Sequence, residues 1–281
     1  MPRLLRRALA AVGIALALGS ASTVIGPTGG ATAATVASPG PILKACYHLK
    51  AGTAADRLVN GRFELRVSSD YLELDETAWL NGPAGRDSTS TGTWFRDDPK
   101  GFHQADHDQT LLAFYCNGDL ALRHSDGALL WHSNTANKGA TRLALTSGGN
   151  LVMTNAAGKA VWQSGSGSVM LPANSVLASN RRLVSAWADQ QGAELRSLNM
   201  QTDGNLVYRV GTAVRWQTRT KVPGSHAGVT TRGQLVVVAP DGRVLWSSGK
   251  TGSSYSALYV SPFWIEQYSP AIATIWWSGV A

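Results

Sequence analysis

Four residues at alternate positions of one segment could bind the hydroxyl groups of a sugar. Gln201, Asp203, Asn205 and Val207 occupy every second position, and in a β-strand such residues point to the same face of the sheet. The Asp carboxylate supplies only acceptors, whereas the Gln and Asn amides supply both donors and acceptors. The row can therefore bond to adjacent hydroxyl groups that need both kinds of partner, while Val207 packs on an apolar C–H face.

A purely structural interpretation of this segment stays open. Asp-Gly-Asn at 203–205 is a common composition of hairpin turns, and the Leu-Val-Tyr that follows is ordinary strand sequence. A structural turn alone would not require Gln201, and this favours the binding interpretation.

A polar stretch at 82–109 has residues that suggest a metal site. His103 and His107 have the spacing of ligands on one face of a helix, but the stretch lacks apolar helical periodicity, and Gln104 stands where a metalloprotease motif has Glu. We therefore expect a solvated loop inserted into a repeat, with no metal and no cofactor. The sequence also has no Gly-x-Ser-x-Gly elbow, no phosphate-binding glycine loop and no convincing acid pair, and so does not indicate an enzyme.

The elements that position these residues repeat along the chain. Five tryptophans, each followed closely by Ser or Thr, are separated by 31, 54, 30 and 31 residues: Trp131, Trp162, Trp216, Trp246 and Trp277. A short strand, a Gly-containing turn and an alternating strand precede the first four, and this predicts hairpin-like units that end at a tryptophan. A degenerate copy of this pattern precedes the fifth tryptophan, and an earlier copy at 61–74 precedes Trp79, so we count six units.

Units of this size bury their apolar faces only when several copies pack around a shared core, which we expect the tryptophans to form. The long interval contains a Gly/Ser linker at 164–168 and then a lead-in at 176–183 that resembles residues 49–58. The sequence thus predicts an all-β protein with two domains of three units each, at 46–168 and 172–281.

Residues 201–208 resemble the mannose-binding signature Gln-x-Asp-x-Asn-x-Val-x-Tyr of the monocot bulb-type lectins. Met200 before them and Trp216-Gln-Thr after them are also similar to the pattern of that family. The resemblance covers nearly the whole mature chain at the level of repeats, but the signature is found in only one unit. It implies two tandem β-prism II domains, each with three pseudo-symmetric antiparallel sheets and a shallow sugar pocket on each sheet. It also implies that Asp203 and Asn205 hold the axial 2-hydroxyl of mannose.

The segment departs from the signature at its last position, where Arg209 stands and Tyr208 comes one residue early. Strict alternation points Tyr208 to the opposite face of the strand. Either a β-bulge restores its place, or Arg209 supplies the outer hydrogen bond, or Tyr208 is a core residue and the pocket is weakened. In another unit, Asn117 and Asp119 place the same functional groups two residues apart in swapped order, which allows a secondary sugar site there.

The N-terminus has the composition of a secretory signal. Three arginines within the first seven residues precede an apolar run at 8–18, and small residues at 31–33 offer a cleavage site. We assign 1–33 as a signal peptide and expect a secreted protein without membrane insertion, because the run is shorter than the ~20 residues of a spanning helix. In an oxidising compartment Cys46 and Cys116 are expected to form a disulfide, with two free thiols as the alternative.

The composition of the 281 residues narrows the class of protein. With 44% hydrophobic and 15% charged residues, 30 Gly and 10 Trp, the chain favours short strands joined by turns over charged helices. The net charge of +7 falls to about +4 without the three signal arginines, and no Lys/Arg block remains, so we expect no nucleic-acid partner.

These observations predict a secreted, non-enzymatic lectin that binds mannose or mannose-containing glycans, mainly through the second domain. Weak single sites would gain avidity from linked domains or from a homodimer. The alternative is a lectin-like bacteriocin, which the tandem layout with one good site also resembles, and which would bind bacterial surface polysaccharide and kill related bacteria. Its further activity would fall to the aromatic tail at 255–281 or to 82–109, unless the tail completes the second domain. A third class, an enzyme such as a glycoside hydrolase, has the least support.

Overall fold

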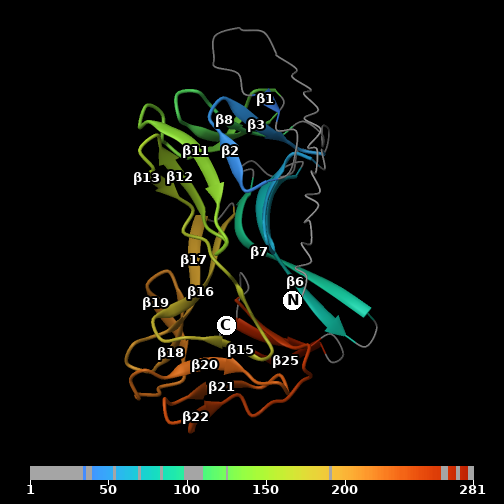
Figure 1. Cartoon of the computed structure of the whole chain (residues 1–281), viewed down its shortest axis with the longest axis vertical. Helices are drawn as coiled ribbons and strands as arrows, with labels where there is room; N and C mark the ends of the chain where they lie inside the picture. The colour runs from blue at the N-terminus through green and yellow to red at the C-terminus, as the bar shows by residue number, and fades with distance from the viewer. Residues whose placement is uncertain are drawn as a thin grey trace, which may run out of the picture.

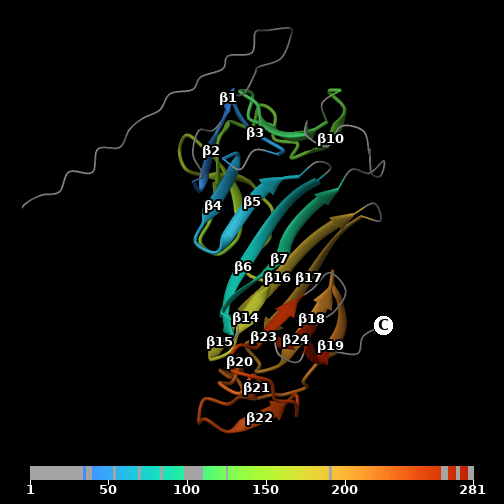
Figure 2. The same ribbon diagram turned by 90° about the vertical axis from the view of Figure 1, so that its right-hand side faces the viewer.

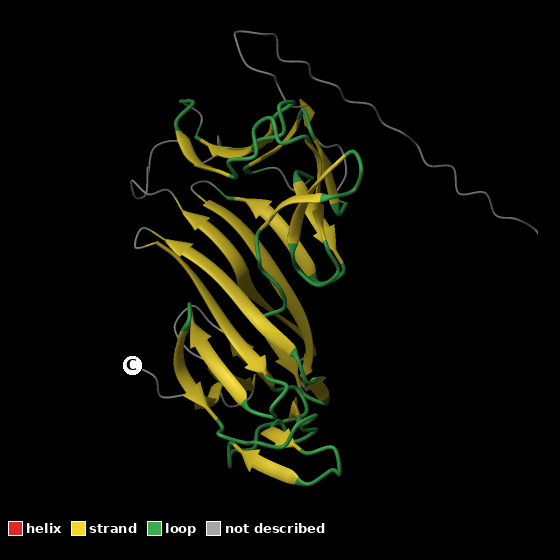
Figure 3. Ribbon diagram, turned by 90° about the vertical axis from the view of Figure 1, so that its left-hand side faces the viewer, coloured by secondary structure: helices red, strands yellow, loops and turns green. Residues whose placement is uncertain are grey.

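The computed structural model shows an all-β protein, as the sequence predicts (Figure 3). It describes residues 34–35, 40–52, 55–68, 71–82, 85–97, 110–124, 126–189, 192–260, 265–269 and 273–277. The predicted signal peptide and the pair His103 and His107 lie outside these residues. Within the described part no helix is long and apolar enough to cross a membrane.

The first half of the chain forms three sheets of four antiparallel strands, and a short strand is added to the second of them (Figure 1). The first sheet consists of β4 (Arg57–Asn60), β5 (Phe63–Val67), β6 (Tyr71–Gly82) and β7 (Gly85–Asp97). The second consists of β3 (Tyr47–Lys50), β8 (Leu111–Phe114), β9 (Leu120–Arg123) and β10 (Leu129–His132), with β1 (Ala34–Thr35) parallel to β3. The third consists of β2 (Ile42–Lys44), β11 (Ala140–Leu145), β12 (Leu151–Asn155) and β13 (Ala160–Gln163).

The second half repeats this plan, so the six predicted units become six four-stranded blocks. One block consists of β16 (Arg181–Asp189), β17 (Gly192–Met200), β18 (Leu206–Val210) and β19 (Ala213–Gln217). The next consists of β15 (Ser175–Leu177), β20 (His226–Val229), β21 (Leu235–Val238) and β22 (Val244–Ser247). The last consists of β14 (Met170–Pro172), β23 (Ala257–Val260), β24 (Ile265–Ser269) and β25 (Ala273–Trp277). The C-terminal tail therefore completes the second set of sheets.

Each set of three sheets encloses its own apolar core, and tryptophans pack against both cores. Trp216, Trp246 and Trp276 contact one another edge to face, with ring centroids 5.3, 5.5 and 6.0 Å apart. The predicted fifth tryptophan, Trp277, was wrong by one residue. The register of β24 with β25 places Trp276 opposite Gln267, as that of β21 with β22 places Trp246 opposite Val237, and Trp276 contacts the other two rings.

In the first core Trp131 and Trp162 lie 5.8 Å apart. The predicted first-unit tryptophan, Trp79, was also wrong, because it pairs with Ser88 near the far end of a long hairpin. The register instead places Trp94 opposite Leu74, just as Trp131 stands opposite Leu122 in the second sheet. The solvated loop predicted at 82–109 is likewise corrected, since 85–97 is strand β7, and 98–109 lies outside the described residues.

Two long hairpins join the halves of the molecule. β6 and β7 have 12 and 13 residues, and β16 and β17 have 9 each. β7 and β16 lie side by side and pair in parallel at Trp94 and Ala186, which makes one continuous eight-stranded sheet (Figure 2). Ala186 is buried in the first core and Leu195 packs against that core, so a hairpin of the second half contributes to the first half. The domain limits at 46–168 and 172–281 stay a prediction.

Glu76 on β6 connects the hairpin β6–β7 by hydrogen bonds to residues 168–169, which lead into the second half. Its side chain is 0% exposed and pairs with Arg62, whose Nε lies 2.6 Å from Oε1. The carboxylate also accepts hydrogen bonds from Val169 N at 2.7 Å and Ser168 Oγ at 2.9 Å. Burial raises the pKa of Glu76, although the Arg62 charge and the hydrogen bonds from 168–170 act in the opposite direction. The buried carboxylate is thus compensated by partners on both sides of the junction.

The predicted disulfide between Cys46 and Cys116 is present, with the Cα atoms 4.5 Å apart. It connects the residue before β3 to the turn after β8. Because the two cysteines are 70 residues apart, the bond closes a loop that contains the whole first sheet.

Candidate functional site

The segment that carries the predicted binding residues is a turn between β17 and β18. Gln201 N donates to Asn205 O at 2.9 Å, and Gly204 N donates to Gln201 O at 3.1 Å. The expectation of one row along a single strand was therefore wrong, because only Val207 lies within β18. The physical reason is Gly204, whose φ of +90° interrupts the extended backbone.

The Asn205 side chain fastens this turn to the residues that follow Trp216. Its Oδ1 accepts hydrogen bonds from Thr218 Oγ1 at 3.1 Å and from Arg219 N at 2.8 Å. Its Nδ2 donates to Gln217 Oε1 at 2.8 Å. The acceptor capacity of Asn205 is thus used inside the protein, and one N–H of its amide is left for a ligand.

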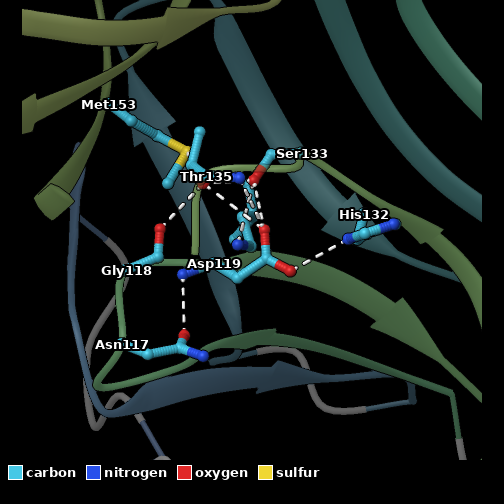
Figure 4. A network of polar contacts seen from close by, with 8 residues as sticks. Asn117, Gly118, Asp119, His132, Ser133, Thr135 and Met153 are labelled. Atoms are coloured by element: carbon cyan, nitrogen blue, oxygen red, sulfur yellow. Dashed lines mark hydrogen bonds and ion pairs between the residues drawn. The ribbon is translucent and has the colours of Figure 1, made fainter. Parts of the chain in front are cut away.

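The same arrangement, a turn held by hydrogen bonds to the residues that follow a tryptophan, occurs around Asp119 in the first half of the chain (Figure 4). We call this arrangement a corner. Asp119 Oδ1 accepts hydrogen bonds from Ser133 Oγ at 3.0 Å and Thr135 N at 2.9 Å, and Oδ2 lies 3.0 Å from His132 Nδ1. The Asn117 Oδ1 accepts a hydrogen bond from Asp119 N at 3.0 Å. Both oxygens of Asp119 are engaged, so the contacts give it a structural role, and the secondary sugar site at Asn117 and Asp119 stays a prediction without further support.

A third corner shows which sequence signal marks this structure. Asn150 Oδ1 accepts hydrogen bonds from Ser164 Oγ at 3.0 Å and Gly165 N at 3.2 Å, and Ser166 Oγ donates to Gly149 O at 2.8 Å. In each corner the hydroxyls come two and four residues after the unit's tryptophan. The pattern Trp-x-Ser/Thr-x-Ser/Thr, which occurs at 131–135, 162–166 and 216–220, is the signal that could have identified these residues.

The charge of Asp119 should contribute to stability in a pH-dependent way. Burial alone would raise its pKa, but the hydrogen bonds from Thr135 N, His132 and Ser133 outweigh burial, and the pKa is lowered from 3.8. A carboxylate with a lowered folded-state pKa stabilises the fold above its unfolded-state pKa. That contribution is lost as the pH falls through the folded-state value.

We expect Asp119→Asn to lower the free energy of unfolding by about 1.5 kcal/mol at pH 7, because the amide keeps one acceptor but loses the charge-assisted bonds. The deficit should shrink as the pH falls below about 4. Urea unfolding of the unchanged protein and the variant at pH 7 and pH 3 measures the difference in stability at each pH. Glu76, whose raised pKa gives the opposite pH dependence, is present in both proteins, so its contribution cancels in that difference. As a control, Asp126→Asn at a site 68% exposed should cost less than about 0.5 kcal/mol. A deficit independent of pH would show that the charge of Asp119 contributes nothing.

Gln201 and Asp203 differ from Asn205 because their polar atoms are mostly unused. Asp203 is exposed, and its Oδ1 accepts one hydrogen bond, from Asn205 N at 2.9 Å. Among the described residues no hydrogen bond is made by the Gln201 amide or by Asp203 Oδ2. These groups, together with the remaining N–H of Asn205, supply two kinds of partner for hydroxyl groups at one place on the surface.

Val207 and Tyr208 do not line a surface site. Val207 is 2% exposed and Tyr208 is 0% exposed, with Tyr208 packed in the core of the second half. Burial raises the pKa of the Tyr208 hydroxyl. A bulge does occur here, but its extra residue is Arg215 on β19, so the alternation of β18 is kept and Tyr208 points inward. Of the three alternatives for Tyr208, the structure selects the core residue, and the sugar-contact role predicted for it was wrong.

A surface cavity of about 620 Å³ opens beside this turn. Gln201 and Thr202 form one side of it, and Asn199, Arg182 and Arg209 come from the neighbouring strands. No group of three or more His, Cys, Asp or Glu side chains in the described part of the chain could hold a metal ion. The cavity is therefore a polar pocket whose chemistry depends on hydrogen bonds and guanidinium groups.

The chain is similar in structure to monocot mannose-binding lectins. A monomeric lectin from Gastrodia elata is 22% identical, with 40% of this chain and 97% of that chain covered and a TM-score of 0.34. The snowdrop (Galanthus nivalis) agglutinin complexed with methyl-α-D-mannoside is 21% identical, with 36% and 90% covered and a TM-score of 0.32. A lectin from Allium sativum is 26% identical, with 38% and 97% covered and a TM-score of 0.31. No family model and no curated protein matches the sequence.

Proposed function

We propose that the protein is a secreted, non-enzymatic lectin that binds mannose or mannose-containing glycans through the turn at 201–205. The observation that carries this proposal is a pair of side chains with unused polar atoms: Gln201, which lines a polar pocket, and Asp203, which is exposed two residues later in the same turn. A turn that only connected β17 to β18 would be complete with Gly204 and Asn205, whose contacts already fix its geometry. Gln201 and Asp203 are therefore available for a ligand.

The unused groups match the needs of a sugar. A hydroxyl group donates one hydrogen bond and accepts others, so a ring with adjacent hydroxyls needs acceptors and donors close together. Asp203 Oδ2 supplies an acceptor, the Gln201 amide supplies both types, and Asn205 supplies a donor. Because an open site with so few bonds cannot offset the entropy of binding by much, we expect millimolar affinity for one monosaccharide, or about 4 kcal/mol.

Titration with methyl α-mannoside, followed by calorimetry or by chemical shifts, tests the site. Gln201→Ala should weaken binding by about tenfold or more, since roughly two neutral hydrogen bonds of the amide would be lost. Its stability should be unchanged, because the amide has no partner within the described residues. Binding that is the same in Gln201→Ala and in the unchanged protein would rule out this turn as the site.

Asp203→Ala provides a second test with a matched control. Asp203 Oδ1 accepts a hydrogen bond from the backbone N two residues on, and Asp241 Oδ1 does the same for Arg243 N at 3.0 Å in an exposed turn before β22. Asp203→Ala and the control Asp241→Ala each remove one such turn hydrogen bond, so they should lower stability by similar amounts. Only Asp203→Ala should abolish mannoside binding. Equal affinities of the two variants would contradict the assignment.

Export of the protein is the other part of the proposal. The disulfide between Cys46 and Cys116 supports an oxidising compartment, and residues 1–33 have the composition of a secretory signal. N-terminal sequencing of protein from the culture medium should begin at Ala34. Recovery of the full chain only inside cells would contradict export.

A further inference from the structure

The pocket beside the proposed sugar-binding turn is positively charged. Its polar lining includes Arg181, Arg182 and Arg209 together with Asn180, Asn199 and Gln201, and no Asp or Glu lines it. Three guanidinium groups around about 620 Å³ repel one another, because each pair of like charges is unfavourable even at the high effective dielectric of a surface. A neutral monosaccharide would leave that repulsion in place.

The fold places two of these arginines beside the proposed site. Arg182 on β16 pairs with Asn199 on β17, and Arg209 on β18 pairs with Ser197 on β17. Their neighbours along the same strands, Leu183 on β16 and Tyr208 on β18, are buried in the core. Arg182 and Arg209 therefore project from the outer face of the sheet, the face toward which the pocket opens.

The guanidinium groups are not neutralised by neighbouring carboxylates. None of the ion pairs formed among the described residues involves Arg181, Arg182 or Arg209. Arg209 Nη1 donates to Thr212 O at 3.1 Å, and this contact orients its side chain while leaving other N–H groups unused. Guanidinium presents a planar fork of donors that matches the oxygens of a carboxylate or phosphate.

We propose that this pocket selects saccharides that carry an anionic group, a phosphate or a carboxylate, whose oxygens are held by Arg182 and Arg209 while Gln201 and Asp203 hold the ring hydroxyls. The proposal rests on the proposed sugar-binding function and names the class of sugar that the same site takes. The turn thus binds the sugar ring, and the two arginines bind the anionic group.

The test compares methyl α-mannoside, mannose 6-phosphate, glucuronic acid and inorganic phosphate by calorimetric titration of the full mature chain. At low salt we expect at least one of the two acidic sugars to bind about tenfold or more tightly than methyl α-mannoside, and the advantage to shrink at about 0.5 M salt as the charges are screened. The two acidic sugars separate a phosphate preference from a carboxylate preference. Inorganic phosphate should bind more weakly than the preferred sugar.

Variants separate the two parts of the site. Arg182→Gln and Arg209→Gln should each reduce the advantage of the acidic sugar over methyl α-mannoside severalfold. Arg243→Gln removes the same charge from an exposed position before β22 and should leave the advantage intact. Gln201→Ala should weaken all the sugars together.

Several results would overturn the inference. If the acidic sugars bind no more tightly than methyl α-mannoside, the charge preference fails and the proposed sugar-binding function stands. If inorganic phosphate binds as tightly as mannose 6-phosphate, the pocket is a simple anion site. If none of the sugars binds, the inference and the proposed function fail together.

Discussion

Substitution of Gly204 by Ala is expected to lower the free energy of unfolding by about 4 kcal/mol, from overpacking of about 1–3 kcal/mol and a left-handed backbone penalty of about 1–2 kcal/mol. The backbone has a φ of +90°, and an added Cβ would overlap Val222 O. Val222 cannot move away without cost, because Ser225 N and Ser225 Oγ both donate to the same carbonyl. The opposite side of the turn is held by Thr220 Oγ1, which donates to Gly204 O.

Gly242→Ala is the matched control, because Gly242 has a φ of +86° but an added Cβ meets nothing within 4 Å. It should show only the backbone penalty, about 1–2 kcal/mol. Urea unfolding followed by tryptophan fluorescence measures both variants, and the difference between them isolates the close approach to Val222. In addition, Gly204→Ala should lose mannoside binding even where it is folded, because the turn that carries Gln201 and Asp203 must shift. Equal losses of stability in the two variants would contradict the role given to this contact.

The repeated architecture was predictable because its signals are local. Tryptophans at intervals of about 30 residues and alternating strands around glycine turns give the six blocks and the all-β class directly. The positions of individual tryptophans were less predictable. Trp276 takes the place expected of Trp277 because it pairs with Gln267, the position that matches Val237 opposite Trp246. Trp94 takes the place expected of Trp79 because the hairpin β6–β7 is longer than the other hairpins.

The candidate site was predicted by residue type, but its geometry depends on contacts that no local pattern specifies. Alternation suggested that Gln201 and Asn205 act alike, whereas Asn205 accepts hydrogen bonds from Thr218 and Arg219, which follow β19 farther along the chain. The inward position of Tyr208 could be weighed from the sequence but not decided, because a bulge within β18 would have reversed its direction, whereas the bulge on β19 leaves it unchanged. The charged pocket was not foreseen, because it joins residues from β16, β17 and β18 that only the sheet brings together.

The connection between the two halves was also not predicted, since a Gly/Ser linker suggests independent domains. The continuous sheet through β7 and β16, the packing of Ala186 into the first core and the contacts of Glu76 with 168–169 instead couple them. A ligand held by β16–β18 is thus bound on a hairpin whose far end is part of the other core. A change in the stability of the first half should therefore change the affinity of the site in the second half.

Removal of the disulfide by the double substitution Cys46→Ser and Cys116→Ser is expected to lower the free energy of unfolding by about 4 kcal/mol. The bond closes a loop across a sequence separation of 70, and the chain-entropy model gives a loss of this size when such a loop is opened in the unfolded state. The loop contains β6 and β7, so the lost constraint acts on the hairpin that contacts the second half. Because the halves share a sheet, we expect one unfolding transition at lower denaturant rather than two.

Guanidinium unfolding with and without a reducing agent, for the unchanged protein and the double variant, measures this effect. The reductant should lower the midpoint of the unchanged protein to near that of the variant, and should leave the variant itself unaffected, which serves as the control. Far-UV and tryptophan signals should change together in each case, since the coupled halves unfold as one unit. A reductant effect below about 1 kcal/mol would contradict the loop-closure contribution. Two separate transitions in the variant, with the tryptophan cluster of the second half surviving, would instead show that the shared sheet does not couple the two cores.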